Sequence, residues 1–234
     1  MSTISEAVGK NLDLSLNEPL KELVYKAFRK TIILGEIQAG QRINEKEFSE
    51  VMNISRTPIR YALQKLVEED LVDHVPGVGI IVKGISINDA HEIYAIRKSL
   101  DVLATLTAMN EMNEADFEEL RELLEETERL NEANEIDQVL QKFSDFNELI
   151  YEKSQMRRLK SIVMKLREYL IYFRDISIRS KERRDKALKE HWLIYYCMLN
   201  QEKEQLELLI TEHLTYSQSF IIKEMEKHLN DSDN

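Results

Sequence analysis

Apolar residues recur at helical spacing through the first third of the chain. The positions from Leu20 to Ile32 follow this spacing and predict a helix that ends at Gly35. Asn44, with Glu47 three residues later, predicts the N-cap of a short helix that ends near Met52.

A third helix is expected to begin at Ser55, and Pro58 is tolerated there because first-turn N–H groups have no intrahelical acceptor. From Leu71 to Val82 the pattern changes to β-branched residues around a Pro-Gly-Val-Gly turn, which predicts a hairpin. Three helices and a hairpin predict a winged helix-turn-helix at residues 18–84, preceded by an N-terminal arm at residues 1–17.

The chain after Gly84 contains no glycine and no proline. Such a stretch predicts consecutive helices joined by short polar turns. The expected helices lie near residues 88–111, 114–131, 135–153, 156–178, 182–200 and 202–229. The fold class is therefore predicted to be mainly α, with an all-helical bundle at residues 88–230.

The net charge of −11 would argue against a nucleic-acid partner, but its distribution matters more. Residues 18–83 carry ten basic and ten acidic side chains, so the acidity lies almost wholly in the helical part. Neither an export segment nor an apolar run long enough to span a membrane is present, which favours a cytoplasmic protein with no membrane partner. The single cysteine, Cys197, excludes an intrachain disulfide and a cysteine-based zinc finger.

The third helix has one apolar and one polar face. The apolar stripe is expected to be buried and comprises Ile59, Ala62, Leu63, Leu66 and Val67. The opposite face carries Arg56, Thr57, Arg60 and Gln64. An arginine at this end of a recognition helix can bind guanine O6 and N7 together, although a solvated basic patch is the alternative.

The run SRTPIRYALQKLVEEDLVDHVPGVGIIV, with LGEIQAGQRINEKEFSEVMNIS before it, resembles the GntR family of bacterial regulators. The resemblance implies that Arg56, Thr57 and Arg60 contact DNA, that Lys46 contacts phosphate, and that the wing at Gly77 reaches the minor groove. Two positions depart from the family. Tyr61 stands where a glutamate is frequent, and Val78 stands where the wing tip often carries a cation.

Four polar residues interrupt the apolar stripes of four predicted helices in the second part: Arg97, Asn147, His191 and His213. Each of them alone is readily explained as a side chain buried in the core with a hydrogen-bond partner. Together they predict a polar cavity inside the bundle, where helical folds place ligand and metal sites.

The pieces IYAIRKSLDVLATLTA, FNELIYEKS and LKEHWLIYYCML resemble the FCD domain of the FadR subfamily, in its six-helix VanR-like branch. That resemblance implies an arginine on the first helix, and an aspartate and three histidines that bind a divalent metal such as zinc or nickel together with a carboxylate effector. Arg97, His191 and His213 match these positions, and Arg174 is a further candidate for effector contact.

Two ligand positions differ, because Phe143 stands at the aspartate and Asn147 at the first histidine. Asp145 is expected to face solvent beside Lys142, since it lies two residues from Asn147 on the helix. His191, His213 and Asn147 make a poor set for zinc or nickel because the carboxylate is missing. Two alternatives stay open: an anionic effector completes a metal site, or the arginine and histidines bind a carboxylate without metal.

These features predict a homodimeric, ligand-responsive transcriptional regulator that binds a palindromic double-stranded operator. A repressor released by a small organic acid is the expected mode. The alternatives are a protein-interaction adaptor whose winged domain no longer binds DNA, and a helical metal-dependent hydrolase using His191 and His213. No Ser-His-Asp, Cys-His or phosphate-loop pattern supports an enzyme.

Overall fold

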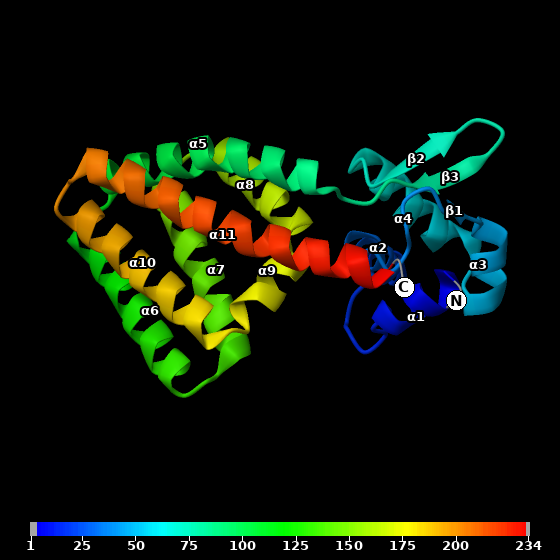
Figure 1. Cartoon of the computed structure of the whole chain (residues 1–234), viewed down its shortest axis with the longest axis horizontal. Coiled ribbons are helices and arrows are strands. Elements are labelled where there is room, and N and C mark those ends of the chain that lie inside the picture. Colours follow the sequence, from blue (N-terminus) through cyan, green and yellow to red (C-terminus); the bar gives the residue numbers. More distant parts are fainter. Residues whose placement is uncertain (1–3, 233–234) are drawn as a thin grey trace. The chain divides into compact units, whose positions relative to one another are not determined.

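The computed structural model describes residues 4–232, with side chains described to residue 228. The chain divides into two compact units between Ile87 and Asn88, and the end of the last helix from Met225 groups with the first unit. The fold confirms the expected mainly α class, with a winged helix-turn-helix followed by an all-helical bundle (Figure 1).

The first unit combines short helices with a small sheet. In chain order its elements are α1 (Ile4–Asn11), α2 (Leu20–Ile33), β1 (Arg42–Ile43), α3 (Glu45–Met52), α4 (Arg56–Glu68), β2 (Val72–Val75) and β3 (Gly79–Val82). Asn44 is the N-cap of α3, as predicted, and its side chain accepts from the backbone N–H of Lys46 at 3.1 Å.

The wing is a three-stranded antiparallel sheet in the order β1-β3-β2. Its hairpin closes where the Val78 N–H donates to the Val75 carbonyl at 3.1 Å. Pro76 and Gly77 occupy the centre of this turn, and Gly77 has φ +78. Proline followed by a residue with positive φ is the pattern of a type II turn, which explains the glycine. Strand β1 was not predicted from the sequence.

The residues that the sequence leaves as an arm contain helix α1, which packs on α2 and α3. Val8 is fully buried, and the Asn11 amide donates to the Thr31 hydroxyl at 3.0 Å. Helix α1 is therefore part of the packed first unit.

The second unit consists of helices. They are α5 (Ile87–Glu111), α6 (Glu114–Glu132), α7 (Ile136–Lys153), α8 (Arg157–Tyr169), α9 (Ile171–Ile178), α10 (Lys181–Leu199) and α11 (Lys203–Ser232). The stretch expected as one helix near 156–178 is thus two, interrupted at Leu170, which has φ −112 and is almost fully buried. Within residues 4–232, no helix is long and apolar enough to cross a membrane.

Candidate functional site

Helix α4 buries one face and exposes the other, as its sequence predicts. Ile59, Ala62, Leu63 and Leu66 are buried. Val67 is 38% exposed, so its predicted burial is wrong. Each residue of a helix advances by about 100°, so Val67, eight residues after Ile59, points roughly 80° away from it. Val67 therefore lies at the edge of the stripe.

The exposed face of α4 presents the predicted DNA-contacting side chains Arg56, Thr57 and Arg60. Arg60 Nε donates to Glu45 Oε2 at 2.9 Å, at the start of α3. Lys46 on α3 is also exposed, and its Nζ lies 3.8 Å from a neighbouring glutamate. Exposed ion pairs contribute about 1 kcal/mol or less, so DNA can displace them.

The two departures from the family pattern lie in different environments. The Tyr61 hydroxyl donates to Glu22 Oε1 at 2.5 Å, and Lys21 Nζ lies 4.5 Å from its ring centroid. Tyr61 therefore braces α4 against α2. Val78 at the wing tip is 43% exposed, and Gly77 beside it has no side chain, so neither of these residues offers a cation to DNA.

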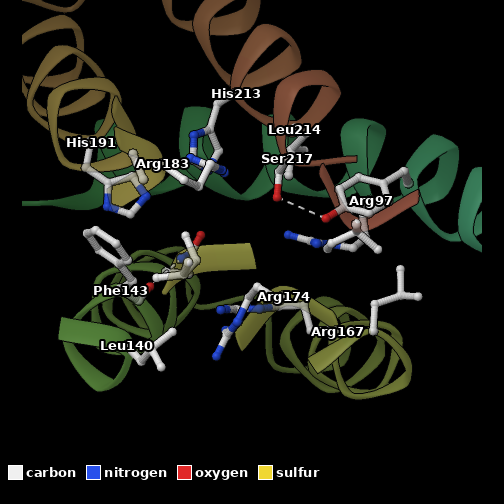
Figure 2. Close-up of a pocket in the computed structure, with 16 residues that line it drawn as sticks. Arg97, Leu140, Phe143, Arg167, Arg174, Arg183, His191, His213, Leu214 and Ser217 are labelled. Carbon is white, nitrogen blue, oxygen red and sulfur yellow. Dashed lines mark hydrogen bonds between the residues drawn. The ribbon is translucent and has the colours of Figure 1, made fainter. Parts of the chain in front are cut away.

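In the second unit, one cavity of about 50 Å³ is lined by all five residues proposed from the sequence to contact an effector. They come from five helices: Arg97 from α5, Asn147 from α7, Arg174 from α9, His191 from α10 and His213 from α11. Figure 2 shows Arg97 and Ser217 on one side of the cavity, and Arg167 and Arg174 on the opposite side.

Two further arginines that the sequence reasoning missed, Arg167 on α8 and Arg183 on α10, line the same cavity. A signal for both exists in the sequence. Arg167 continues the buried positions Leu159 and Val163 at four-residue intervals, and Arg183 precedes His191 by two such intervals.

Asp101, also missed, fixes the position of Arg97. Arg97 Nη2 donates to Asp101 Oδ2 at 3.0 Å, and the Tyr151 hydroxyl donates to Oδ1 at 2.8 Å. Burial alone would lower the pKa of Arg97, but the Asp101 carboxylate raises it, so Arg97 is charged. Burial, followed by the Asp101 charge, raises the pKa of Tyr151, which remains a hydrogen-bond donor.

The two histidines have different surroundings. The His191 ring stacks on Phe146 at a centroid distance of 4.2 Å and meets the Phe143 ring edge at 5.0 Å. Burial, and then the charge of His213, hold its pKa well below its usual value, so the imidazole is neutral at pH 7. His213 Nδ1 lies 2.6 Å from Glu190 Oε2, and this contact orients its ring.

These residues do not fit a tightly held metal ion. Phe143 presents a ring where a carboxylate is needed, and the Asn147 amide donates to the Phe143 carbonyl at 2.6 Å. Asp145 pairs with Lys142 at 4.0 Å, and it is absent from the described cavity lining. Within residues 4–232, no group of three or more His, Cys, Asp or Glu side chains is placed to hold a metal.

Comparison with known families matches both parts of the chain. Residues 20–82 match bacterial regulatory proteins of the gntR family, and residues 92–216 match the FCD domain. The second match alone covers more than half of the chain and is consistent with the FadR subfamily.

Relatives and solved structures match along most of their length. The chain is 27% identical over 207 residues to the uncharacterized HTH-type transcriptional regulator YdhC of Bacillus subtilis, covering 87% of this chain and 92% of that protein. It is 23% identical to the HTH-type transcriptional repressor RspR of Escherichia coli, covering 86% and 88%. Its fold is similar to that of E. coli McbR/YncC, with a TM-score of 0.62, 21% identity and coverage of 88% and 98%.

The exposed recognition helix, the wing, the helical cavity and both family matches lead to one assignment. The chain belongs to the GntR family of bacterial regulatory proteins and is a DNA-binding transcriptional regulator with a C-terminal FCD domain.

Proposed function

We propose that this regulator is a homodimeric repressor that a small anionic metabolite releases from a palindromic operator. The observation that carries the proposal is the cavity on which six helices direct cationic or polar side chains. Such a convergence in a helical bundle is typical of a ligand site. An effector that binds one arrangement of the dimer more tightly than another shifts the population toward that arrangement. The free energy by which it can change operator affinity is set by its difference in affinity for the two arrangements.

A binding role is favoured over catalysis by the partners of the polar groups. The Ser217 hydroxyl lies 3.0 Å from the Tyr94 hydroxyl, and the imidazole of His213 is engaged by Glu190. Ser217 is therefore not paired with a general base, as a nucleophile would need to be. His191 is enclosed by aromatic rings.

The test is a mobility-shift titration with the DNA upstream of the protein's own gene, with and without a panel of small organic acids. We expect at least one acid to raise the protein concentration for half-binding about tenfold or more, which corresponds to a coupling free energy of about 1.4 kcal/mol. Arg97→Gln should bind the DNA normally and lose this response, because glutamine can still donate to Asp101 but carries no charge for the acid. Arg158→Gln, on the exposed surface of α8, is the matched control.

Either of two results would reject the proposal. Absence of binding to the upstream DNA would favour the adaptor alternative. If no acid alters operator binding, or if Arg97→Gln still responds to the acid, the cavity is not the effector site.

A dimer interface on α10 is proposed from its exposed apolar side chains. Leu193 is 44%, Tyr196 50% and Leu199 46% exposed, at intervals of three residues along one face. Apolar side chains grouped in this way mark interaction surfaces. A second copy of the chain is the proposed occupant because a palindromic operator requires two winged domains.

Leu193→Glu combined with Leu199→Glu is expected to weaken the dimer at least about a hundredfold, because two charges would be desolvated in the interface. Sedimentation of the full chain measures this directly. Leu208→Glu, on α11 and 58% exposed, should leave the dimer unchanged. A double variant that stays dimeric at the same concentrations would exclude this face of α10.

A further inference from the structure

Four arginines line the cavity, and two of them are already neutralised. Arg97 pairs with Asp101 at 3.0 Å. Arg174 pairs with Asp175 at 2.8 Å and donates to the Ser144 hydroxyl at 3.1 Å. Each of these two guanidiniums therefore has a carboxylate partner at hydrogen-bond distance, although the buried Nε of Arg97 has no acceptor.

Arg183 is buried without an adequate anion. Its side chain is 3% exposed, and the nearest carboxylate oxygen, Glu190 Oε2, lies 4.0 Å away and is already bonded to His213. Both Nε and Nη1 of Arg183 lack a hydrogen-bond acceptor. Burial lowers the pKa of Arg183 because the cation is not fully compensated.

Arg167 is half-buried and likewise has a buried donor atom without an acceptor. No carboxylate of the described residues lies within ion-pair distance of its guanidinium, and Nη1 is buried with no acceptor. Its guanidinium carbon lies 5.9 Å from the Tyr151 ring centroid. Burial lowers its pKa, and the charges of Arg97 and Arg174 act in the same direction, whereas Tyr151 and Asp101 raise it.

Arg184, the neighbour of Arg183, shows how the chain satisfies an arginine that has only a structural role. It is 1% exposed, yet Nε donates to Asn131 at 3.0 Å, Nη2 to Asn134 at 2.8 Å and Nη1 to the Arg179 carbonyl at 2.6 Å. A buried N–H group without an acceptor costs about 1–3 kcal/mol, and more when it is charged. The unsatisfied donors of Arg167 and Arg183 therefore indicate a missing anionic partner.

We infer that the cavity binds a compact dianion directly, with Arg167 and Arg183 supplying the two positive charges that a metal ion would otherwise supply. The inference rests on the proposed effector function and names its ligand class. A guanidinium pairs with both oxygens of a carboxylate or phosphate, so two free guanidiniums suit a ligand of charge −2. The volume of about 50 Å³ is several times what one water needs, which favours a short ligand.

The experiment measures binding by the full-length protein without DNA, after treatment with EDTA. Malonate and inorganic phosphate are the dianionic probes, and acetate at equal ionic strength is the monoanionic control. We expect a dianion at about a hundred times its Kd to raise the melting temperature by about 5 °C or more, and acetate to have little effect. Calorimetry should give the same affinity with EDTA as with added zinc or nickel.

Arg167→Gln and Arg183→Gln should each weaken the dianion at least tenfold. Each should lower the stability of the ligand-free protein less than a fully hydrogen-bonded buried arginine would, because the nearest carboxylate oxygen lies 4.0 Å from Arg183 and Arg167 Nη1 has no acceptor. Arg184→Gln is the structural control and should destabilise the ligand-free protein, since it breaks the bonds to Asn131 and Asn134. Arg158→Gln should match the unchanged protein in both readouts.

The inference is overturned if no dianion binds, if Arg167→Gln and Arg183→Gln respond like the unchanged protein, or if binding requires added zinc or nickel. Dianion binding that leaves the operator complex intact would instead reject the proposed release from DNA. The two failures are therefore distinguishable.

Discussion

Replacing Arg56 and Arg60 together with alanine is expected to weaken operator binding at least about a hundredfold. Both side chains are exposed near the start of α4, where a recognition helix presents its side chains to base edges. A bidentate arginine–guanine pair contributes about 1–3 kcal/mol, so the loss of two pairs accounts for this factor. A mobility-shift titration at fixed salt concentration measures it.

Two controls separate this effect from misfolding and from general charge loss. Neither residue is buried, so the melting temperature should change little. Arg129→Ala removes an exposed arginine from α6 in the second unit and should leave operator affinity unchanged. Glu45→Gln, which frees Arg60 from its ion pair, is expected to strengthen binding modestly. Unaltered affinity in the double variant would show that α4 is not the reading element.

The sequence predicted the recognition helix well because several local signals agree. The tolerance of Pro58 in a first turn and the buried stripe from Ile59 act within α4 itself, and the Asn44 cap marks the start of α3, the helix before it. Val67 was wrongly predicted to be buried because eight residues do not make a whole number of helical turns.

The missed elements depend on contacts between segments distant in the sequence. An eight-residue helix such as α1 is marginal by itself, and burial of Val8 against its neighbours stabilises it. Nothing in the local sequence marks the break at Leu170, because the apolar pattern runs through it. Strand β1 exists only through its pairing with β3.

The candidate site could be found in part because a polar residue on an apolar stripe is visible in one sequence. Arg97 and His191 were identified in this way, and Arg167 and Arg183 satisfy the same criterion. Their partners are harder to predict. The pairing of Asp101 with both Arg97 and Tyr151, and the lack of an acceptor for Arg167 Nη1 among the described residues, depend on how the helices pack.

The substitutions at Phe143 and Asn147 can be tested by reversing them. Phe143→Asp with Asn147→His should create a zinc or nickel site whose affinity exceeds that of the unchanged protein at least a hundredfold. The Phe143 ring lies 5.0 Å from the His191 ring, which in turn lies 5.1 Å from the His213 ring. A carboxylate and an imidazole introduced here would join two existing imidazoles in a set that suits these ions.

The ligand-free double variant should be less stable, because replacing a buried phenylalanine with aspartate costs about 3 kcal/mol or more. Added zinc should restore much of that loss, since metal binding to the folded state contributes to folding free energy. The measurement is the melting temperature with zinc and with EDTA, supported by metal analysis of the purified variant. Each single variant should show a smaller zinc response, because each lacks one of the four ligands.

A double variant that folds but gains nothing from zinc or nickel would show that the helices do not hold these positions in a converging geometry. A strong zinc response in the unchanged protein would contradict the conclusion that its cavity residues do not fit a tightly held metal ion. The expected result, weak binding before the substitutions and tight binding after them, would mean that the helices hold these four positions in a geometry that can bind a metal. The positive charge of the metal would then be replaced in this chain by Arg167 and Arg183, which line the same cavity and keep buried donor atoms without acceptors.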